Sequence, residues 1–212
     1  MNINRKFFIV ISGIIFCVVV IIILKLTLFN ETLKSVAMKV LSEINDKNPD
    51  IVFGYMIDEE KKMINADRNK FKTFFNNFYL VRMHGFQPVG KPAEMISEPQ
   101  KLLVLTQKYL HPDGRETELS VPAIITDDGI KIVGISRCLF LTALATYAHP
   151  DKPFPAGKEK PLFFANSIDE ALPLLKNSGL DGFMYGFGEK SKFYSWEGFR
   201  DYMLANAERL NQ

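Results

Sequence analysis

"KLLVLTQKYLHPDGRETELSVPAIITDDGIKIVG", residues 101–134, decides the fold of this chain. Apolar and polar residues alternate through three segments, and glycine-containing turns at residues 112–115 and 127–129 separate them. Such alternation is typical of strands that bury one face, and glycine adopts the positive φ that tight hairpin turns require. We therefore predict three consecutive antiparallel strands, at residues 101–111, 116–126 and 130–138, after a bent strand or loop at residues 85–99.

Helical patterns precede these strands. Residues 30–44 repeat apolar side chains at spacings of three and four with Asn30 as a cap, and residues 51–63 form a shorter helical pattern. Asp67 can cap a third helix, and one face of that helix carries four phenylalanines: Phe71, Phe74, Phe75 and Phe78. Helices followed by an antiparallel meander indicate an α+β fold with the helices packed on one face of the sheet.

The phenylalanine-bearing helix, the hairpin turn at residues 112–115 and the "DDGIKIVG" stretch at residues 127–134 resemble the nuclear transport factor 2-like superfamily. This superfamily is also called cystatin-like or ketosteroid isomerase-like, and the resemblance covers residues 30–138. It implies a long helix and two shorter ones packed on a curved antiparallel sheet that wraps into a cone. Many bacterial envelope members carry Trp-Lys-Ile after the last turn, where this chain has Ile130-Lys131-Ile132.

The N-terminal stretch "FFIVISGIIFCVVVIIIL", Phe7 to Leu24, is uncharged throughout and follows Arg5 and Lys6. An apolar run of about 18 or more residues can span a bilayer as a helix, whereas the apolar core of a cleaved signal peptide has about 7–15 residues. The run continues into Lys25–Phe29 without an Ala-x-Ala cleavage motif. We expect an uncleaved transmembrane anchor at residues 1–29; the alternatives are a cleaved signal peptide and a buried core helix.

The orientation of this anchor follows from the charges that flank it. Arg5 and Lys6 precede the apolar run, while Lys25, Lys34 and Lys39 follow it, so the contrast in charge is modest. The N-terminal tail is very short, and signal anchors of this shape usually leave it in the cytoplasm. We expect a single-pass protein of the cell membrane with its body outside the cytoplasm, as in the periplasm beside a bacterial inner membrane.

Charge and cysteine usage exclude several classes of function. The net charge is +2, and setting aside the three basic residues of the first 25 leaves 23 basic residues against 24 acidic ones. A chain with so little excess positive charge does not have the basic surface that binding to nucleic acid requires. Cys17 and Cys138 lie far apart, and the three histidines are scattered, so spacing rules assemble no disulfide framework, redox motif or metal site. We expect no metal and no cofactor.

The C-terminal part follows a proline-rich linker. Residues 150–161 contain four prolines, and the next helical pattern starts with Ser167 and Glu170 as a capping box and stops at Gly179. Residues 180–188 can form a short strand, and Ser195 can cap a final helix.

This part is too small to hold a large core of its own. The predicted organisation is therefore an N-terminal transmembrane helix at residues 1–29, an α+β domain with a curved, cone-like sheet at residues 30–149, and a linker with a small α/β C-terminal extension at residues 150–212.

Candidate site residues fall into two groups. The resemblance implies a concave pocket, which in the enzymes of the superfamily presents a carboxylate and a tyrosine, but no residue here matches a catalytic motif. The candidates for such a pocket are Tyr55, Tyr79, Glu118 and Arg137. Aromatic residues are enriched at interface hot spots, so residues 183–196 either bind a partner or pack the C-terminal segment onto the sheet. The candidates for a partner patch are Phe183, Tyr185, Phe187, Tyr194 and Trp196. By contrast, the charged run at residues 58–62 is typical of a solvated helix face.

The leading functional hypothesis is a membrane-anchored envelope protein that performs no catalysis and binds a protein partner or a small apolar ligand. One alternative is a small hydrolase or isomerase that uses a pocket carboxylate. Another is a structural subunit of a secretion or cell-envelope assembly. A homodimer is one form that the protein partner could take.

Overall fold

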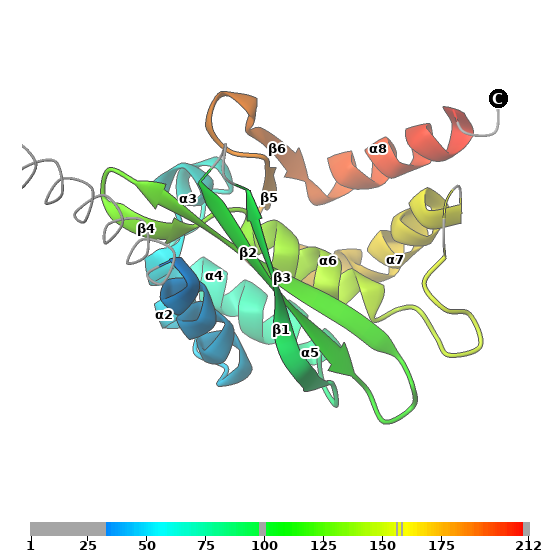
Figure 1. The fold of residues 1–212 in the computed structure, drawn as a ribbon. Coiled ribbons are helices and arrows are strands. Elements are labelled where there is room, and N and C mark those ends of the chain that lie inside the picture. The colour runs from blue at the N-terminus through cyan, green and yellow to red at the C-terminus, as the bar shows by residue number, and fades with distance from the viewer. Residues whose placement is uncertain (1–32, 98–100, 156, 158, 210–212) are drawn as a thin grey trace, which may run out of the picture.

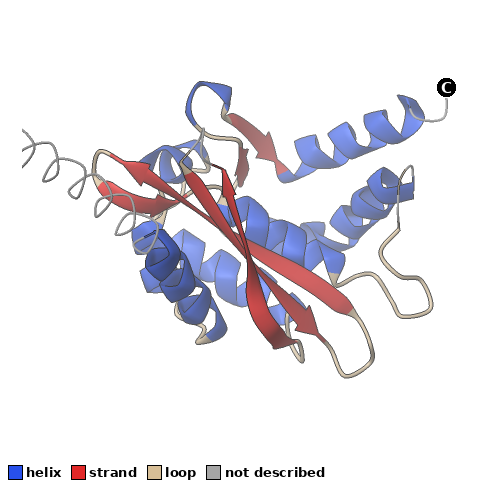
Figure 2. Ribbon diagram, viewed as in Figure 1, coloured by secondary structure: helices blue, strands red, loops and turns tan. Residues whose placement is uncertain are grey.

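The computed structural model describes residues 33–209 apart from residues 98–100, 156 and 158. The predicted anchor at residues 1–29 and the Asn30 cap lie outside the described residues. Among the residues that are described, no helix is both long and apolar enough to cross a membrane. The fold is α+β, as the sequence predicted: helices pack against a four-stranded antiparallel sheet (Figure 1, Figure 2).

The sheet is a meander whose strands lie side by side in chain order. Its strands are β1 (Gln87–Ser97), β2 (Leu102–Leu110), β3 (Glu116–Thr126) and β4 (Gly129–Ile132). β2 and β3 pair along their whole length, from Leu102 opposite Ile124 to Leu110 opposite Glu116. The turn between them contains Gly114 at a φ of 91°, so a side chain there would strain the hairpin.

β1 forms one edge of the sheet. A bulge between Val89 and Ala93 interrupts its pairing with β2. Of the bent strand or loop predicted for this segment, the structure has the bent strand. Pro88 and Pro92 lie on the same strand and carry no backbone N–H.

Strand alternation gives β2 and β3 one buried and one exposed face. Leu105, Tyr109 and Leu119 are buried on the helix-covered face. Lys108 and Glu118 point to the opposite face and are exposed. In Figure 1, α4 to α6 lie behind the sheet, which leaves its front without a covering ribbon.

The helices that precede the sheet fill its covered face. They comprise a helix at residues 33–45, α2 (Pro49–Tyr55), α3 (Asp58–Met63), α4 (Arg68–Phe74), the π-helical η1 (Phe75–Tyr79) and α5 (Leu80–Arg82). The single helical piece predicted at residues 51–63 is two helices. They separate at Met56 and Ile57 because this segment contacts the end of β4: the Ile57 N–H donates to the Ile132 carbonyl at 3.1 Å.

The phenylalanine-bearing helix is confirmed. Asp67 caps it by accepting a hydrogen bond from the Lys70 N–H at 2.8 Å. Its four phenylalanines, Phe71, Phe74, Phe75 and Phe78, are fully buried. Complete burial of one such side chain stabilises a fold by about 1.5–3 kcal/mol, so this helix is a major part of the core.

The prediction of the last strand is wrong beyond residue 132. β4 ends at Ile132, and α6 (Ile135–Ala145) begins three residues later, although residues 130–138 were expected to form one strand. The chain turns at Gly134, which has a φ of 66° and precedes the first helical residue. Glu60 then accepts hydrogen bonds from the Gly134 and Ser136 N–H groups at 2.7 and 2.9 Å. A distant side chain therefore starts this helix, which local alternation could not reveal.

The C-terminal segment comprises α7 (Glu159–Lys176), β5 (Gly182–Tyr185), the short η2 (Gly188–Lys190), β6 (Lys192–Ser195) and α8 (Trp196–Arg209). α7 starts eight residues before the predicted cap, so Ser167 is buried inside the helix. Ser195 does cap α8, because its hydroxyl accepts from the Gly198 N–H at 3.0 Å. The predicted strand at residues 180–188 is β5, and β6 pairs with it in a hairpin.

One hydrophobic core joins the C-terminal segment to the rest of the fold. The Trp196 ring stacks on Phe74 with centroids 5.9 Å apart, and its indole N–H donates to the Leu180 carbonyl at 2.9 Å. Phe140 of α6 packs against Trp196 and against Phe183 of β5. The segment therefore contacts both α4 and α6.

Candidate functional site

The helix-covered face of the sheet is filled with side chains. Tyr79 is almost fully buried there, 5.1 Å from Phe75 between ring centroids, and burial raises the pKa of its hydroxyl well above the ordinary value. Tyr55 is half-buried on α2, with the Lys39 ammonium 5.4 Å from the centre of its ring. These two pocket candidates therefore lie in or beside the core, and neither lines the cavity described next.

A cavity of about 710 Å³ lies where the free edge of β3 meets α6 and the start of α7. It contains the other two pocket candidates, Glu118 and Arg137. Its remaining lining comes from β1 to β3, α6, α7 and the preceding segment: Val89, Lys108, Tyr109, Leu110, Glu116, Thr117, Ser120, Cys138, Leu141, Thr142, Ala145, Phe154, Lys160 and Phe164.

Two hydrogen bonds hold α6 against β3 beside this cavity. The Thr117 hydroxyl donates to the Thr142 carbonyl at 3.0 Å, and the Thr142 hydroxyl donates to the Glu118 carbonyl at 2.8 Å. β4 pairs only with the last residues of β3, from Ala123 to Thr126. α6 therefore lies beside the part of β3 that β4 does not pair with. The half-buried side chains of α6 form one wall of the cavity.

The charged groups of the cavity differ in their partners. Lys108 and Glu118 are cross-strand neighbours and form an ion pair at 3.5 Å. The Arg137 guanidinium lies 4.5 Å from the centre of the Tyr185 ring, and the Lys160 ammonium lies 5.1 Å from that of Phe154. Among the described residues, no carboxylate forms an ion pair with Arg137 or Lys160. These two cations contact aromatic rings instead.

The only cysteine of the body, Cys138, lines the cavity but is a poor nucleophile. Burial raises the pKa of its thiol to about 12, although nearby Arg137 acts to lower it. The reactive form of cysteine is the thiolate, so this thiol stays protonated near neutral pH. Within the described part of the chain, no three histidine, cysteine or acidic side chains come together as a metal site would require.

Glu60 is a buried carboxylate that sequence reasoning placed on a solvated face. It is fully buried, and its oxygens accept from Gly134, from the Ser136 N–H and, at 2.6 Å, from the Ser136 hydroxyl. Burial raises its pKa, while these hydrogen bonds act to lower it. All donors to its carboxylate belong to the start of α6, so its role is to hold that helix in place. The one clue in the sequence was a charged residue at a helical position facing the core.

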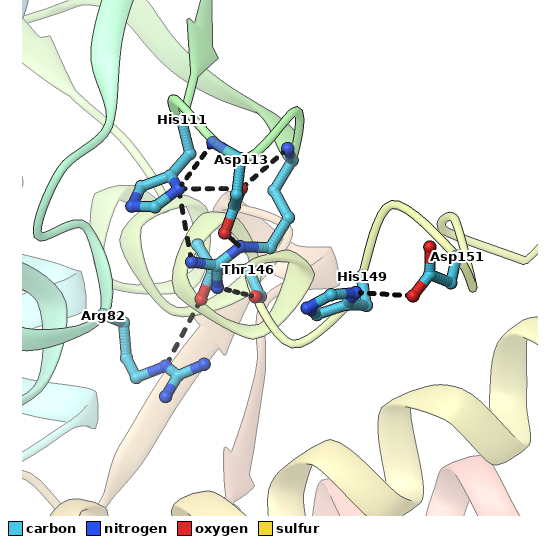
Figure 3. A network of polar contacts seen from close by, with 7 residues as sticks. Arg82, His111, Asp113, Thr146, His149 and Asp151 are labelled. Atoms are coloured by element: carbon cyan, nitrogen blue, oxygen red, sulfur yellow. Dashed lines mark hydrogen bonds and ion pairs between the residues drawn. The ribbon is translucent and has the colours of Figure 1, made fainter.

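A polar cluster fastens the β2–β3 hairpin to the end of α6 (Figure 3). Asp113 contacts His111 Nδ1 at 2.7 Å and accepts from Arg115 Nε at 2.8 Å. Arg115 also donates to the Thr146 carbonyl at 3.0 Å, and Arg82 Nε donates to the Thr146 hydroxyl at 3.3 Å. Partial burial acts to raise the pKa of Asp113, but hydrogen bonds from Arg115 and His111 outweigh it and lower the pKa overall. The geometry supports a structural role for the predicted turn.

The aromatic candidates for a partner patch separate into core and surface. Phe183 and Trp196 are buried in the shared core, which removes them from any exposed patch. Phe187 and Tyr194 are half-buried, and Tyr185 is 48% exposed. Two further aromatic residues extend this surface, and neither was among the candidates: Phe193 and Tyr202, which are 43% and 47% exposed.

In comparisons with known proteins, the chain matches no family model, no curated protein and no solved structure. The resemblance to the nuclear transport factor 2-like superfamily therefore stays an expectation from the sequence.

Proposed function

We propose that this chain is a membrane-anchored protein with an extracytoplasmic body that binds a small, largely apolar ligand without catalysing a reaction. The anchor is the uncharged run at residues 7–24, and the body is a nuclear transport factor 2-like domain, with its C-terminal extension packed on it. The cavity of about 710 Å³ carries the proposal. Small-molecule sites are typically concave, largely apolar, and about 300–1,000 Å³ in volume.

The composition of the lining favours binding of an apolar molecule. Leu110, Leu141, Ala145, Phe154 and Phe164 offer aliphatic and aromatic contacts from four different parts of the chain. Charged and hydroxyl-bearing side chains from β2, β3, α6 and α7 lie among them, and such groups can orient a ligand.

Catalysis in this cavity has less support. A pocket carboxylate that acts as a base needs a raised pKa and a proton within reach. Glu118 instead is exposed and pairs with Lys108, and the candidate phenols Tyr55 and Tyr79 lie elsewhere. The Cys138 thiol is protonated near neutral pH. The cavity therefore favours a binding protein over the alternative of a hydrolase or isomerase.

Partner binding is a second candidate function, favoured by the exposed aromatic surface of β5, β6 and α8. The Tyr194 ring contacts two other tyrosines, with its centroid 6.3 Å from that of Tyr185 and 5.7 Å from that of Tyr202. Tyrosines of this kind are enriched at the centres of protein interfaces. A structural subunit of an envelope assembly would use such a surface.

Filling the cavity tests the proposed function. Ala145→Phe places a ring in the lining, and Asn166→Phe adds the same ring at an exposed position of α7 outside it. The full chain, kept in solution by an amphipathic polymer, is titrated with octan-1-ol by calorimetry, and the heat with polymer alone is subtracted.

We expect octan-1-ol to bind the parent and the Asn166→Phe variant equally, and to lose at least about tenfold in affinity for Ala145→Phe, because the added ring occupies the space of the ligand. Circular dichroism and thermal unfolding confirm that both variants fold. Equal binding by all three proteins, or binding by none, contradicts a ligand site in this cavity.

A further inference from the structure

The wall that α6 presents to the cavity is polarised along its length. Arg137, Cys138, Leu141, Thr142 and Ala145 all line the cavity, and their spacing of one, three or four residues places them on one face of the helix. The wall begins with the cation and ends with small or apolar side chains. From residue 137 to residue 145 a helix rises by about 12 Å, which separates the two ends clearly.

Arg137 has binding capacity that the fold leaves unused. Its guanidinium carries five N–H donors in a planar fork. Within the described part of the chain, however, it stacks on the Tyr185 ring. It is half-buried, and no carboxylate among the described residues forms an ion pair with it. The Glu60 carboxylate lies against the same end of α6, but it accepts hydrogen bonds from the N–H groups of Gly134 and Ser136 and forms no ion pair with Arg137.

The remaining charges leave the cavity positive. Lys108 and Glu118 neutralise each other as an ion pair, which leaves Arg137 and Lys160 against Glu116. A planar guanidinium matches a carboxylate or phosphate with two parallel hydrogen bonds, and an aromatic ring behind it holds its plane in position.

Building on the proposed function, we infer that the ligand is an anionic amphiphile. Its carboxylate or phosphate head binds Arg137, and its hydrocarbon part extends along Leu141 and Ala145 toward Phe164. The head group could belong to a free fatty acid or to a membrane lipid, since both present the same chemistry to the guanidinium.

Three probes with the same chain and different heads test this inference on the full chain in amphipathic polymer. They are octanoate, octan-1-ol and octyltrimethylammonium, titrated by calorimetry with polymer blanks. We expect octanoate to bind about tenfold more tightly than octan-1-ol, since a hydrogen bond to a charged group is worth about that much, and the ammonium probe to bind most weakly.

Two substitutions assign the effect to Arg137. Arg137→Gln should reduce octanoate affinity to that of octan-1-ol and leave octan-1-ol binding unchanged, whereas Arg137→Lys should retain part of the preference because it keeps the charge without the fork. The matched control is Arg68→Gln, which removes an exposed guanidinium outside the cavity and should change neither affinity. Thermal unfolding checks that each variant folds.

The outcomes separate the two proposals. If none of the three probes binds, the proposed function fails and the inference fails with it. If octan-1-ol and octanoate bind equally, or if the ammonium probe binds best, the cavity is a ligand site but the inference is overturned. A fourth probe, dihexanoylphosphatidylglycerol, identifies the source: tighter binding than octanoate supports the inference with a membrane lipid as ligand, and weaker binding supports it with a free fatty acid.

Discussion

At the scale of single residues, Glu60 shows how one buried side chain can organise two distant segments. It lies on α3, yet every hydrogen bond that its carboxylate accepts comes from the start of α6. The start of a helix has N–H groups without partners inside the helix, and a carboxylate is a suitable acceptor for them. α6 in turn forms a wall of the cavity, so the position of that wall depends on Glu60.

Glu60→Gln should destabilise the protein by about 1–3 kcal/mol at neutral pH, because the amide NH₂ replaces an acceptor of a buried N–H. The volume of the side chain is unchanged, so a cavity does not contribute. Urea unfolding measures the loss, and Glu189→Gln, at an exposed position on η2, is the control. A loss equal to that of the control would show that the contact with Gly134 and Ser136 contributes nothing.

The stability difference between the parent protein and Glu60→Gln should also depend on pH. Burial raises the pKa of Glu60 above 4.5 in the folded state, so the folded state holds this proton more tightly than the unfolded one. The part of the stability that is linked to this proton is then complete below pH 4.5 and is lost as the pH rises through the raised pKa. The deficit of Glu60→Gln should therefore grow as the pH is lowered; the opposite slope would mean that the N–H donors outweigh burial.

At the scale of elements, local sequence determines some helices and strands, and tertiary contacts determine the others. Asp67, the glycine turns and the paired lengths of β2 and β3 were predictable, because caps, turns and alternation act over a few residues. The start of α6, the early start of α7 and the strand β6 were not. The start of α6 depends on Glu60, which is 76 residues away from Ser136 in the chain. β6 depends on its pairing with β5.

The candidate site likewise has residues that the sequence indicated and residues that it did not. Glu118 and Arg137 were pocket candidates on predicted strands, and both line the cavity. The cavity itself depends on the segment around Phe154 and on Phe164, which fold back from a region that the sequence presented as linker and extension. The resemblance directed attention to Tyr55 and Tyr79 on the covered face, where bulky side chains fill the space.

Two glycines, one in a helix and one in a strand, should respond oppositely to substitution by alanine. Gly54 lies in α2 with open space around it, so Gly54→Ala should stabilise the protein by about 0.5–1 kcal/mol through helix propensity. At Gly182 of β5, an added Cβ would lie 2.0 Å from the Tyr194 carbonyl oxygen. Gly182→Ala should therefore separate the β5–β6 hairpin and destabilise the protein by more than about 1 kcal/mol.

Thermal unfolding followed by circular dichroism measures both effects. Gly54→Ala serves as the control for the chemistry of the substitution, since both variants add one methyl group. A stable Gly182→Ala protein would contradict the close approach of β5 and β6.

At the scale of the whole molecule, the C-terminal segment and the α+β body share one core. Trp196, the only tryptophan in the chain, packs between Phe74 of α4, Phe140 of α6 and Phe183 of β5. Residues from both sides of the proline-rich linker thus enclose the same ring. Such sharing predicts that the two parts unfold together.

Trp196 fluorescence should therefore report the same urea midpoint as far-ultraviolet circular dichroism, which follows the helices and strands of the entire chain. Coincident transitions are the mark of one cooperative unit. A fluorescence midpoint at lower urea would instead mean that the C-terminal segment separates first and that the body is stable without it.

The two edges of the sheet also determine how this protein behaves at high concentration. β1 carries Pro88 and Pro92 and is bent by a bulge, while β4 is only four residues long and gives way to α6. Exposed edges that are straight and rich in N–H groups recruit strands from other molecules and lead to fibrils. Both edges here are unsuited to that growth. Crowded copies can therefore meet through side chains while their sheets remain separate.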